Sequence, residues 1–261
     1  LITDEGERQH IRYHLNTTVI EGLIGRLYDL INPGRGVNLG GISMGKRFVI
    51  GLLALCLLSF CVQLALYPSL PETVPIHWNA AGEVDGWAGK PAVLLLGLLP
   101  FGLTVLFAAL PKIDPKKESY RKHMKVYRPL SALFVLFFIG MVWLVMLSAL
   151  EFKLPVGGLI SAGIGLIFIF IGNYMPRIRP NYTFGIRLPW TLANETVWYK
   201  THRVGGALLM AAGILMGVSG FLPGIAAFAG IAALLAVVIG SSVYAWVIYK
   251  REVRQNGKPE E

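Results

Sequence analysis

Long apolar runs without a single charge limit most strongly how this chain can fold. Each run is close to the roughly 20 residues that a helix needs to cross a bilayer. The runs cover residues 48–67, 92–110, 130–150, 156–175, 204–222 and 225–249. Every Lys, Arg, Asp and Glu lies outside them, as expected for spans, because a charge at the bilayer centre costs at least about 2.5 kcal/mol.

The backbone then determines the class of fold. In lipid, N–H and C=O groups must be paired within the protein, so only helices and closed barrels cross a membrane. A barrel would need short segments that alternate in hydrophobicity, and these runs do not alternate. The chain is 54% apolar and 15% charged, against about a quarter charged in soluble domains. We predict an all-α, polytopic membrane protein with about six transmembrane helices.

The loops between the runs differ in basic residues. Residues 112–128, 177–203 and the C-terminal tail are rich in Lys and Arg, whereas residues 68–91 contain Lys90 alone. Because basic loops stay in the cytoplasm, this alternation predicts that both termini are cytoplasmic. The net charge of +9 therefore indicates contact with anionic membrane lipids, and nucleic acid is not an expected partner.

Cys56 and Cys61 lie five residues apart in one run, which predicts neither a disulfide nor a metal site.

Residues 1–43 form a separate segment. Apolar residues from Leu15 to Ile31 recur at helical spacing, which predicts an amphipathic helix on the membrane surface or on a partner. Met44-Gly45 is followed by two basic residues and the first run, as at the start of a membrane protein, so residues 1–43 are either native or appended. Residues 44–150 then hold the first three spans, and residues 151–261 hold the last three. Small residues in the fourth and fifth spans, at Gly158, Ala162, Gly163, Gly213 and Gly217, predict close packing of these two helices.

The loop after the first span is rich in aromatic and polar residues. An extended piece is predicted at residues 74–78, followed by tight turns at Ala81-Gly82 and Asp85-Gly86. Three interpretations are open: a cap anchored by Trp78 and Trp87, a ligand-facing or toxin-facing surface, and a metal site at His77. The metal site is disfavoured, since one His among scattered carboxylates lacks a ligand spacing.

A second polar loop covers residues 177–203. Thr191 is a plausible N-cap for a helix that continues to the Gly205-Gly206 pair. On that helix Glu195, Trp198 and His202 share a face, but Glu195 and His202 lie about 10 Å apart along the axis, too far to pair. Arg187 is the candidate partner of Glu195. The loop could staple a surface helix to the bundle, bind a partner or small ligand, or supply an acid and a base; no nucleophile next to a base is apparent.

Both loops carry motifs of fixed residue types at fixed spacing. The first, which contains His77, Trp78, Asn79, Gly82, Asp85, Gly86 and Trp87, resembles the domain of unknown function that commonly precedes the SdpI region. The second is similar to the signature of the SdpI family of bacterial membrane immunity proteins. Its candidate binding residues are Asn181, Gly185, Arg187, Pro189, Trp190, Thr191, Asn194, Glu195, Trp198, His202 and Arg203.

The resemblance implies a multi-pass protein of the bacterial cell membrane, without cofactor or enzymatic activity. It further implies protection against a secreted antimicrobial peptide met at the outer face, and signalling through a cytoplasmic repressor held at the inner face. We therefore predict an immunity protein with a toxin-sensing role. The alternatives are a small-molecule or ion transporter, for which Gln63, Thr104 and Asn173 are the main polar groups within the spans, and a membrane-embedded enzyme acting on lipid or peptide through Glu195 and His202.

Overall fold

A computed structural model describes residues 43–79, 82–113, 117–180, 185–222 and 228–256. It contains six helices that are long and apolar enough to cross a membrane, which confirms the predicted fold class. These helices are α2 (Lys46–Leu66), α3 (Ala92–Ile113), α4 (Lys117–Ala149), α5 (Val156–Tyr174), α7 (Glu195–Ser219) and α8 (Ala229–Asn256). The amphipathic helix predicted within residues 1–43 and the turn at residues 223–224 lie outside the described residues.

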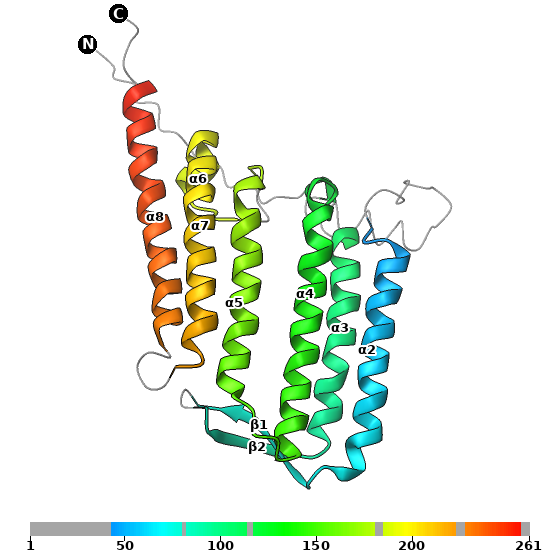
Figure 1. Cartoon of the computed structure of the whole chain (residues 1–261). Coiled ribbons are helices and arrows are strands. Elements are labelled where there is room, and N and C mark those ends of the chain that lie inside the picture. The colour runs from blue at the N-terminus through cyan, green and yellow to red at the C-terminus, as the bar shows by residue number, and fades with distance from the viewer. Residues whose placement is uncertain (1–42, 80–81, 114–116, 181–184, 223–227, 257–261) are drawn as a thin grey trace, which may run out of the picture.

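The polar loops gather at opposite ends of the bundle (Figure 1). One end, the hairpin end, carries strands β1 (Thr73–Trp78) and β2 (Val84–Gly89). The other, the basic end, carries the start of α2, the short helix α6 (Pro189–Ala193) and the end of α8. The predicted separation of the two loops is thus present in the fold, while the side of the membrane that each end faces stays a prediction.

The six helices form two halves, α2–α4 and α5–α8, which meet along a seam where α4 packs against α5. In the second half, glycines bring α5 and α7 into backbone contact, as the small residues predict. A Cβ built on Gly213 would lie 2.7 Å from the Gly165 carbonyl oxygen, and one on Gly172 would lie 2.6 Å from the Gly206 carbonyl oxygen. Helix α8 packs on the other side of α7, where Lys200 forms an ion pair with Glu252 at 2.7 Å.

Polar side chains connect the helices of the first half. The Trp143 indole N–H of α4 donates to the Ser59 hydroxyl of α2 at 2.9 Å, and the Gln63 amide donates to the same oxygen at 3.1 Å. Gly97 of α3 faces the Gln63 amide so closely that no Cβ could stand there. Hydrogen bonds of this kind hold helices together in lipid, where burial of apolar surface gives no driving force.

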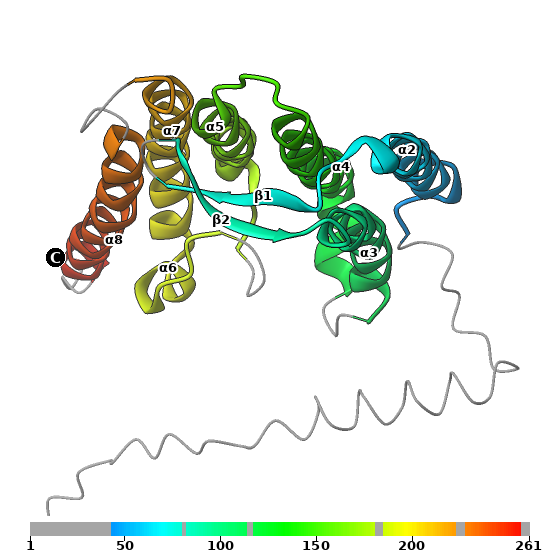
Figure 2. The same ribbon diagram turned by 90° about the horizontal axis from the view of Figure 1, so that it is seen from below.

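The hairpin is seated on the first half and reaches the second. Val74 of β1 is fully buried against Val93 of α3 and Met146 of α4. At the tip, the Gly82 Cα lies 4.0 Å from where a Cβ of Gly157 would stand, at the start of α5. The hairpin therefore crosses the seam, as the view from below shows (Figure 2).

The turn predicted at Asp85-Gly86 is wrong. Both residues lie within β2, and Gly86 pairs with His77 of β1. Antiparallel pairing with β1 overrides the local turn tendency of an Asp-Gly pair. Gly86 instead lets the two strands approach closely, since a Cβ at this position would lie 2.7 Å from the His77 Cβ. The other predicted turn is present at Gly82, which has a φ of 80°.

Candidate functional site

The loop at the basic end begins with a turn built around Thr191. Its hydroxyl accepts from the Leu188 N–H at 2.9 Å and donates to the Ile186 carbonyl at 2.8 Å. The prediction that Thr191 is an N-cap is wrong, because α6 starts two residues earlier, at Pro189, and Leu188 is the cap. Proline already has the φ of a first helical residue, so it sets the start of the helix.

Asn194 caps the long helix that follows. Its side-chain oxygen accepts from the Val197 N–H at 3.0 Å, and α7 begins at Glu195. The helix continues without interruption past the Gly205-Gly206 pair to Ser219, so it includes most of the fifth apolar run. These glycines lie in the helix interior and pack tightly, with Gly206 against the backbone of Gly172 in α5.

Trp198 and His202 form the centre of this site. Both side chains are fully buried, and their rings stack with centroids 4.1 Å apart, which confirms that they share a helix face. The Trp198 indole N–H donates to the Ile178 carbonyl at 2.8 Å. The site therefore joins α7 to the segment directly after α5.

Both ring nitrogens of His202 are engaged. The Ile186 N–H donates to Nε2 at 3.0 Å, and Nδ1 lies 2.8 Å from the Trp198 carbonyl oxygen. Because a backbone N–H can only donate, Nε2 is the acceptor, and the proton of the neutral ring lies on Nδ1. In this arrangement His202 holds the loop through both of its ring nitrogens.

Gly185 closes the site on the remaining side of the imidazole. It has a φ of 100°, a conformation that side chains rarely adopt. A Cβ at this position would also overlap Nε2 of His202. Glycine is thus required for backbone conformation and for space.

The other predicted residues are placed around this core. Arg187, Pro189, Glu195 and Arg203 are exposed at the basic end, and Trp190 is half-buried. Asn181 lies outside the described residues, and the pairing of Glu195 with Arg187 stays a prediction. The result is a rigid, hydrogen-bonded scaffold with charged side chains on its surface.

The sequence missed several residues of this scaffold. Ile178 and Ile186 contribute only backbone atoms, for which residue type gives no signal. Thr201 is fully buried, and its hydroxyl has no hydrogen-bond partner among the described atoms. Its place one helical turn after Trp198 could have indicated that it shares the buried face.

At the hairpin end, ionic and polar pairs fix the strands. His77 Nδ1 lies 2.5 Å from an Asp85 carboxylate oxygen, with both side chains largely exposed. Asn79 closes the turn, donating from its backbone to the Glu83 carbonyl at 2.9 Å and accepting the Glu83 N–H on its side chain at 3.0 Å. The two Trp residues differ, because Trp78 packs against the buried cluster whereas Trp87 is 61% exposed. Of the two Trp residues, only Trp78 therefore anchors the hairpin to the helices.

Neither end carries a recognisable metal centre in the part of the chain that the structure describes. No three His, Cys, Asp or Glu side chains come together there in a way that could hold an ion. His77, the residue considered for such a site, pairs with Asp85 of the neighbouring strand.

A six-helix bundle with a folded hairpin at one end and a Trp-His scaffold at the other defines a multi-pass membrane protein. Residues 177–250 match the SdpI/YfhL protein family, and residues 54–100 match a domain of unknown function, DUF1648. The resemblance predicted from both motifs is thereby confirmed, because the first motif lies in the region that matches DUF1648 and the second in the region that matches the SdpI/YfhL family.

A relative extends this similarity over most of the chain. The Immunity protein SdpI of Bacillus subtilis (strain 168) is 28% identical over 208 residues, which cover 79% of this chain and 97% of that protein. No solved structure matches the chain.

Proposed function

We propose that this chain is a non-enzymatic immunity protein that protects a bacterium against a secreted antimicrobial peptide. The observation that carries the proposal is the relative named as an immunity protein, which is matched over 97% of its length. The match therefore includes both the hairpin end and the basic end. The engaged ring of His202 favours a binding role over an acid-base role for the loop at the basic end.

The hairpin end is the proposed contact surface for the peptide. Trp87 and Ile76 are 61% and 41% exposed, and the hydrogen-bonded pair of His77 and Asp85 lies beside them. Exposed aromatic residues on a rigid element are typical energetic centres of protein interfaces. Their place next to the span ends suits a peptide that acts at the membrane surface.

The basic end is the proposed surface for a cytoplasmic repressor. Arg187, Glu195 and Arg203 project from a scaffold that hydrogen bonds hold in one conformation. Binding of the peptide at the hairpin end would change the affinity of this second surface. In this proposal the protein both protects and signals, with one end for each partner.

Survival of toxin-sensitive cells that express the full chain tests the proposal. Wild-type protein is expected to raise the lethal concentration of the peptide. Trp87→Ala is expected to bind the peptide about 30-fold more weakly, because truncation of a residue at the centre of an interface costs roughly 2 kcal/mol. Most of the protection should be lost with it. Trp246→Ala is the matched control, because Trp246 is 44% exposed and lies on α8, outside the hairpin.

Two outcomes would contradict the proposal in different ways. Unchanged killing of cells that contain wild-type protein in their membrane would remove the immunity function. Equal protection by wild type and Trp87→Ala would leave immunity intact and remove the hairpin as the contact surface. Loss of a membrane-bound repressor from Arg187→Ala cells, but not from Trp246→Ala cells, would support the signalling role.

A further inference from the structure

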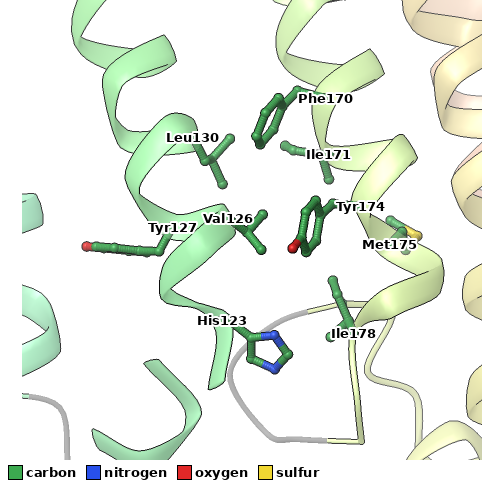
Figure 3. A pocket seen from close by; sticks show the side chains of 10 residues that line it. His123, Val126, Tyr127, Leu130, Phe170, Ile171, Tyr174, Met175 and Ile178 are labelled. Carbon is green, nitrogen blue, oxygen red and sulfur yellow. The ribbon is translucent and has the colours of Figure 1, made fainter. Parts of the chain in front are cut away.

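A half-enclosed cavity of about 200 Å³ lies in the seam between the two halves, at the basic end (Figure 3). Helix α4 contributes Val126 and Leu130 to its wall, and α5 contributes Ile171 and Tyr174. Ile178 and Gly185, from the loop after α5, also line it, and His123 of α4 adds an imidazole ring. The figure shows the side chains of α4 and α5 facing each other across the opening.

The size and lining of the cavity restrict what can occupy it. Its walls are mainly hydrocarbon groups and aromatic rings, so an apolar occupant is favoured. The volume exceeds the roughly 150 Å³ of an apolar cavity that binds benzene and is below the roughly 300 Å³ of the smallest typical ligand sites. A segment of a flexible chain fits these limits better than a whole rigid molecule.

The depth of the cavity matches the upper acyl region of one leaflet. The span that contains α5 runs from Val156 to Arg177, and the cavity lies along its last two turns. A lipid beside this part of the helix has its headgroup level with Arg177 and its chain level with Ile171. An acyl chain in the cavity would therefore lie at the level where the chains of the adjacent leaflet begin.

The charge beside the cavity selects the headgroup. The Arg177 guanidinium lies over the ring of Tyr174, 5.4 Å from its centroid, and Tyr174 lines the cavity. The Arg177 side chain is exposed, so its charge can meet a lipid headgroup. Basic residues at the membrane surface favour anionic lipids.

We propose that this cavity holds one acyl chain of an anionic phospholipid, with the headgroup beside Arg177. The lipid fills the seam at the end that the hairpin does not cover. It also contacts the wall of the Trp-His scaffold, because the Ile178 carbonyl holds Trp198 and Gly185 lies against His202. This site goes beyond the proposed immunity function and does not depend on it.

Native mass spectrometry of the full chain provides the test. The protein is purified in mild detergent from vesicles that contain equal amounts of palmitoyl-oleoyl phosphatidylglycerol and phosphatidylcholine. Wild type is expected to retain one phosphatidylglycerol after the other lipids are lost. Ile171→Trp fills the cavity from α5 and is expected to lose this lipid, whereas Leu166→Trp, on the same helix and at a 57% exposed position, retains it.

A second pair of variants tests the charge. Arg177→Gln is expected to lower the preference for phosphatidylglycerol over phosphatidylcholine about fivefold, the effect of one basic residue at the surface. Lys250→Gln is the control, because Lys250 also lies over an aromatic ring, that of Trp246, but on α8. It is expected to keep the wild-type preference.

A second cavity-filling variant tests whether Ile171→Trp loses the lipid because the cavity is filled or because the protein is misfolded. Val126→Phe fills the same cavity from α4, and both filled variants are expected to elute as wild type does in size-exclusion chromatography. Retention of phosphatidylglycerol by both would overturn the site. Equal retention of the two lipids by wild type would overturn the headgroup assignment, and retention of detergent or fatty acid alone would overturn the phospholipid.

Discussion

The imidazole of His202 is held from three sides at the basic end. Trp198 stacks on it and accepts its Nδ1–H, the Ile186 N–H binds Nε2, and Gly185 leaves the space that the ring fills. A buried donor that loses its acceptor costs about 1–3 kcal/mol, so this set of contacts stabilises the loop strongly. The exposed side chains of Arg187, Glu195 and Arg203 are attached to this loop and helix, so the same contacts fix where their charges lie.

The sequence predicted the side chains of this set but not their partners. Gly185, Trp198 and His202 were recognised from their spacing within a motif. Helical periodicity placed Trp198 and His202 on one face, which is correct. Their contacts with Ile178 and Ile186 use backbone atoms that every residue has, so only the folded path of the loop could show them.

Substitution of Gly185 tests the role of the space beside His202. Gly185→Ala is expected to lower the free energy of unfolding by about 2–4 kcal/mol, through about 1–2 kcal/mol of backbone strain and the displaced hydrogen bond to Ile186. Thermal unfolding of the full chain in detergent measures the change.

Gly82→Ala separates the two contributions. Gly82 has a similar φ of 80°, but nothing lies within 4 Å of a Cβ built there. This variant is expected to lose only the strain, about 1–2 kcal/mol. Equal losses for both variants would show that the contact with His202 contributes nothing.

Helix boundaries mark the limit of sequence reasoning at the scale of elements. The apolar runs located all six spans, but α4 begins at Lys117 and α8 ends at Asn256, well outside the runs. An apolar run marks only the part of a helix that lies in the hydrocarbon region. The hydrogen bonds of the helix can continue into polar sequence beyond that region. In the same way Asp85-Gly86 has the composition of a turn, and only its pairing with β1 makes it a strand.

The contact of α5 with α7 gives a prediction at this scale. Gly172→Ala would place a Cβ 2.6 Å from the Gly206 carbonyl oxygen, so the two helices would have to separate. Overpacking of this kind costs about 1–3 kcal/mol, and the melting temperature in detergent is expected to fall.

Gly240→Ala in α8 serves as the comparison. Nothing lies within 4 Å of a Cβ at Gly240, and alanine favours a helix over glycine by up to about 1 kcal/mol. The melting temperature is therefore expected to stay constant or rise. A fall as large as that of Gly172→Ala would mean that loss of glycine, and not backbone contact, determines stability.

The whole molecule presents two chemically different ends, and the sequence predicted this division from charge alone. The hairpin and the basic loops do lie at opposite ends of the bundle (Figure 1). Their places relative to the seam were not predictable, because no periodicity in one sequence relates α4 to α5. The hairpin crosses the seam because Val74 is packed into the buried cluster of α3 and α4, which is a tertiary contact.

Orientation in the membrane gives the prediction at this scale. In a background of Cys56→Ala and Cys61→Ser, Asp85→Cys is expected to react with a membrane-impermeant thiol reagent in intact cells. Arg203→Cys is expected to react only after permeabilisation, since the basic end should face the cytoplasm. Both positions are exposed, so a difference reports sidedness. Reaction of both in intact cells would contradict the assigned orientation.

The glycine contacts between α5 and α7 also determine where this protein can change shape. Helices that touch through their backbones have no rotamers to exchange at the contact, so they respond to force as one solid piece. Motion between the two membrane faces is then expected where other helices meet this pair, and the seam between α4 and α5 is one such place. Distance measurements between α4 and α5, rather than between α5 and α7, are the place to see it.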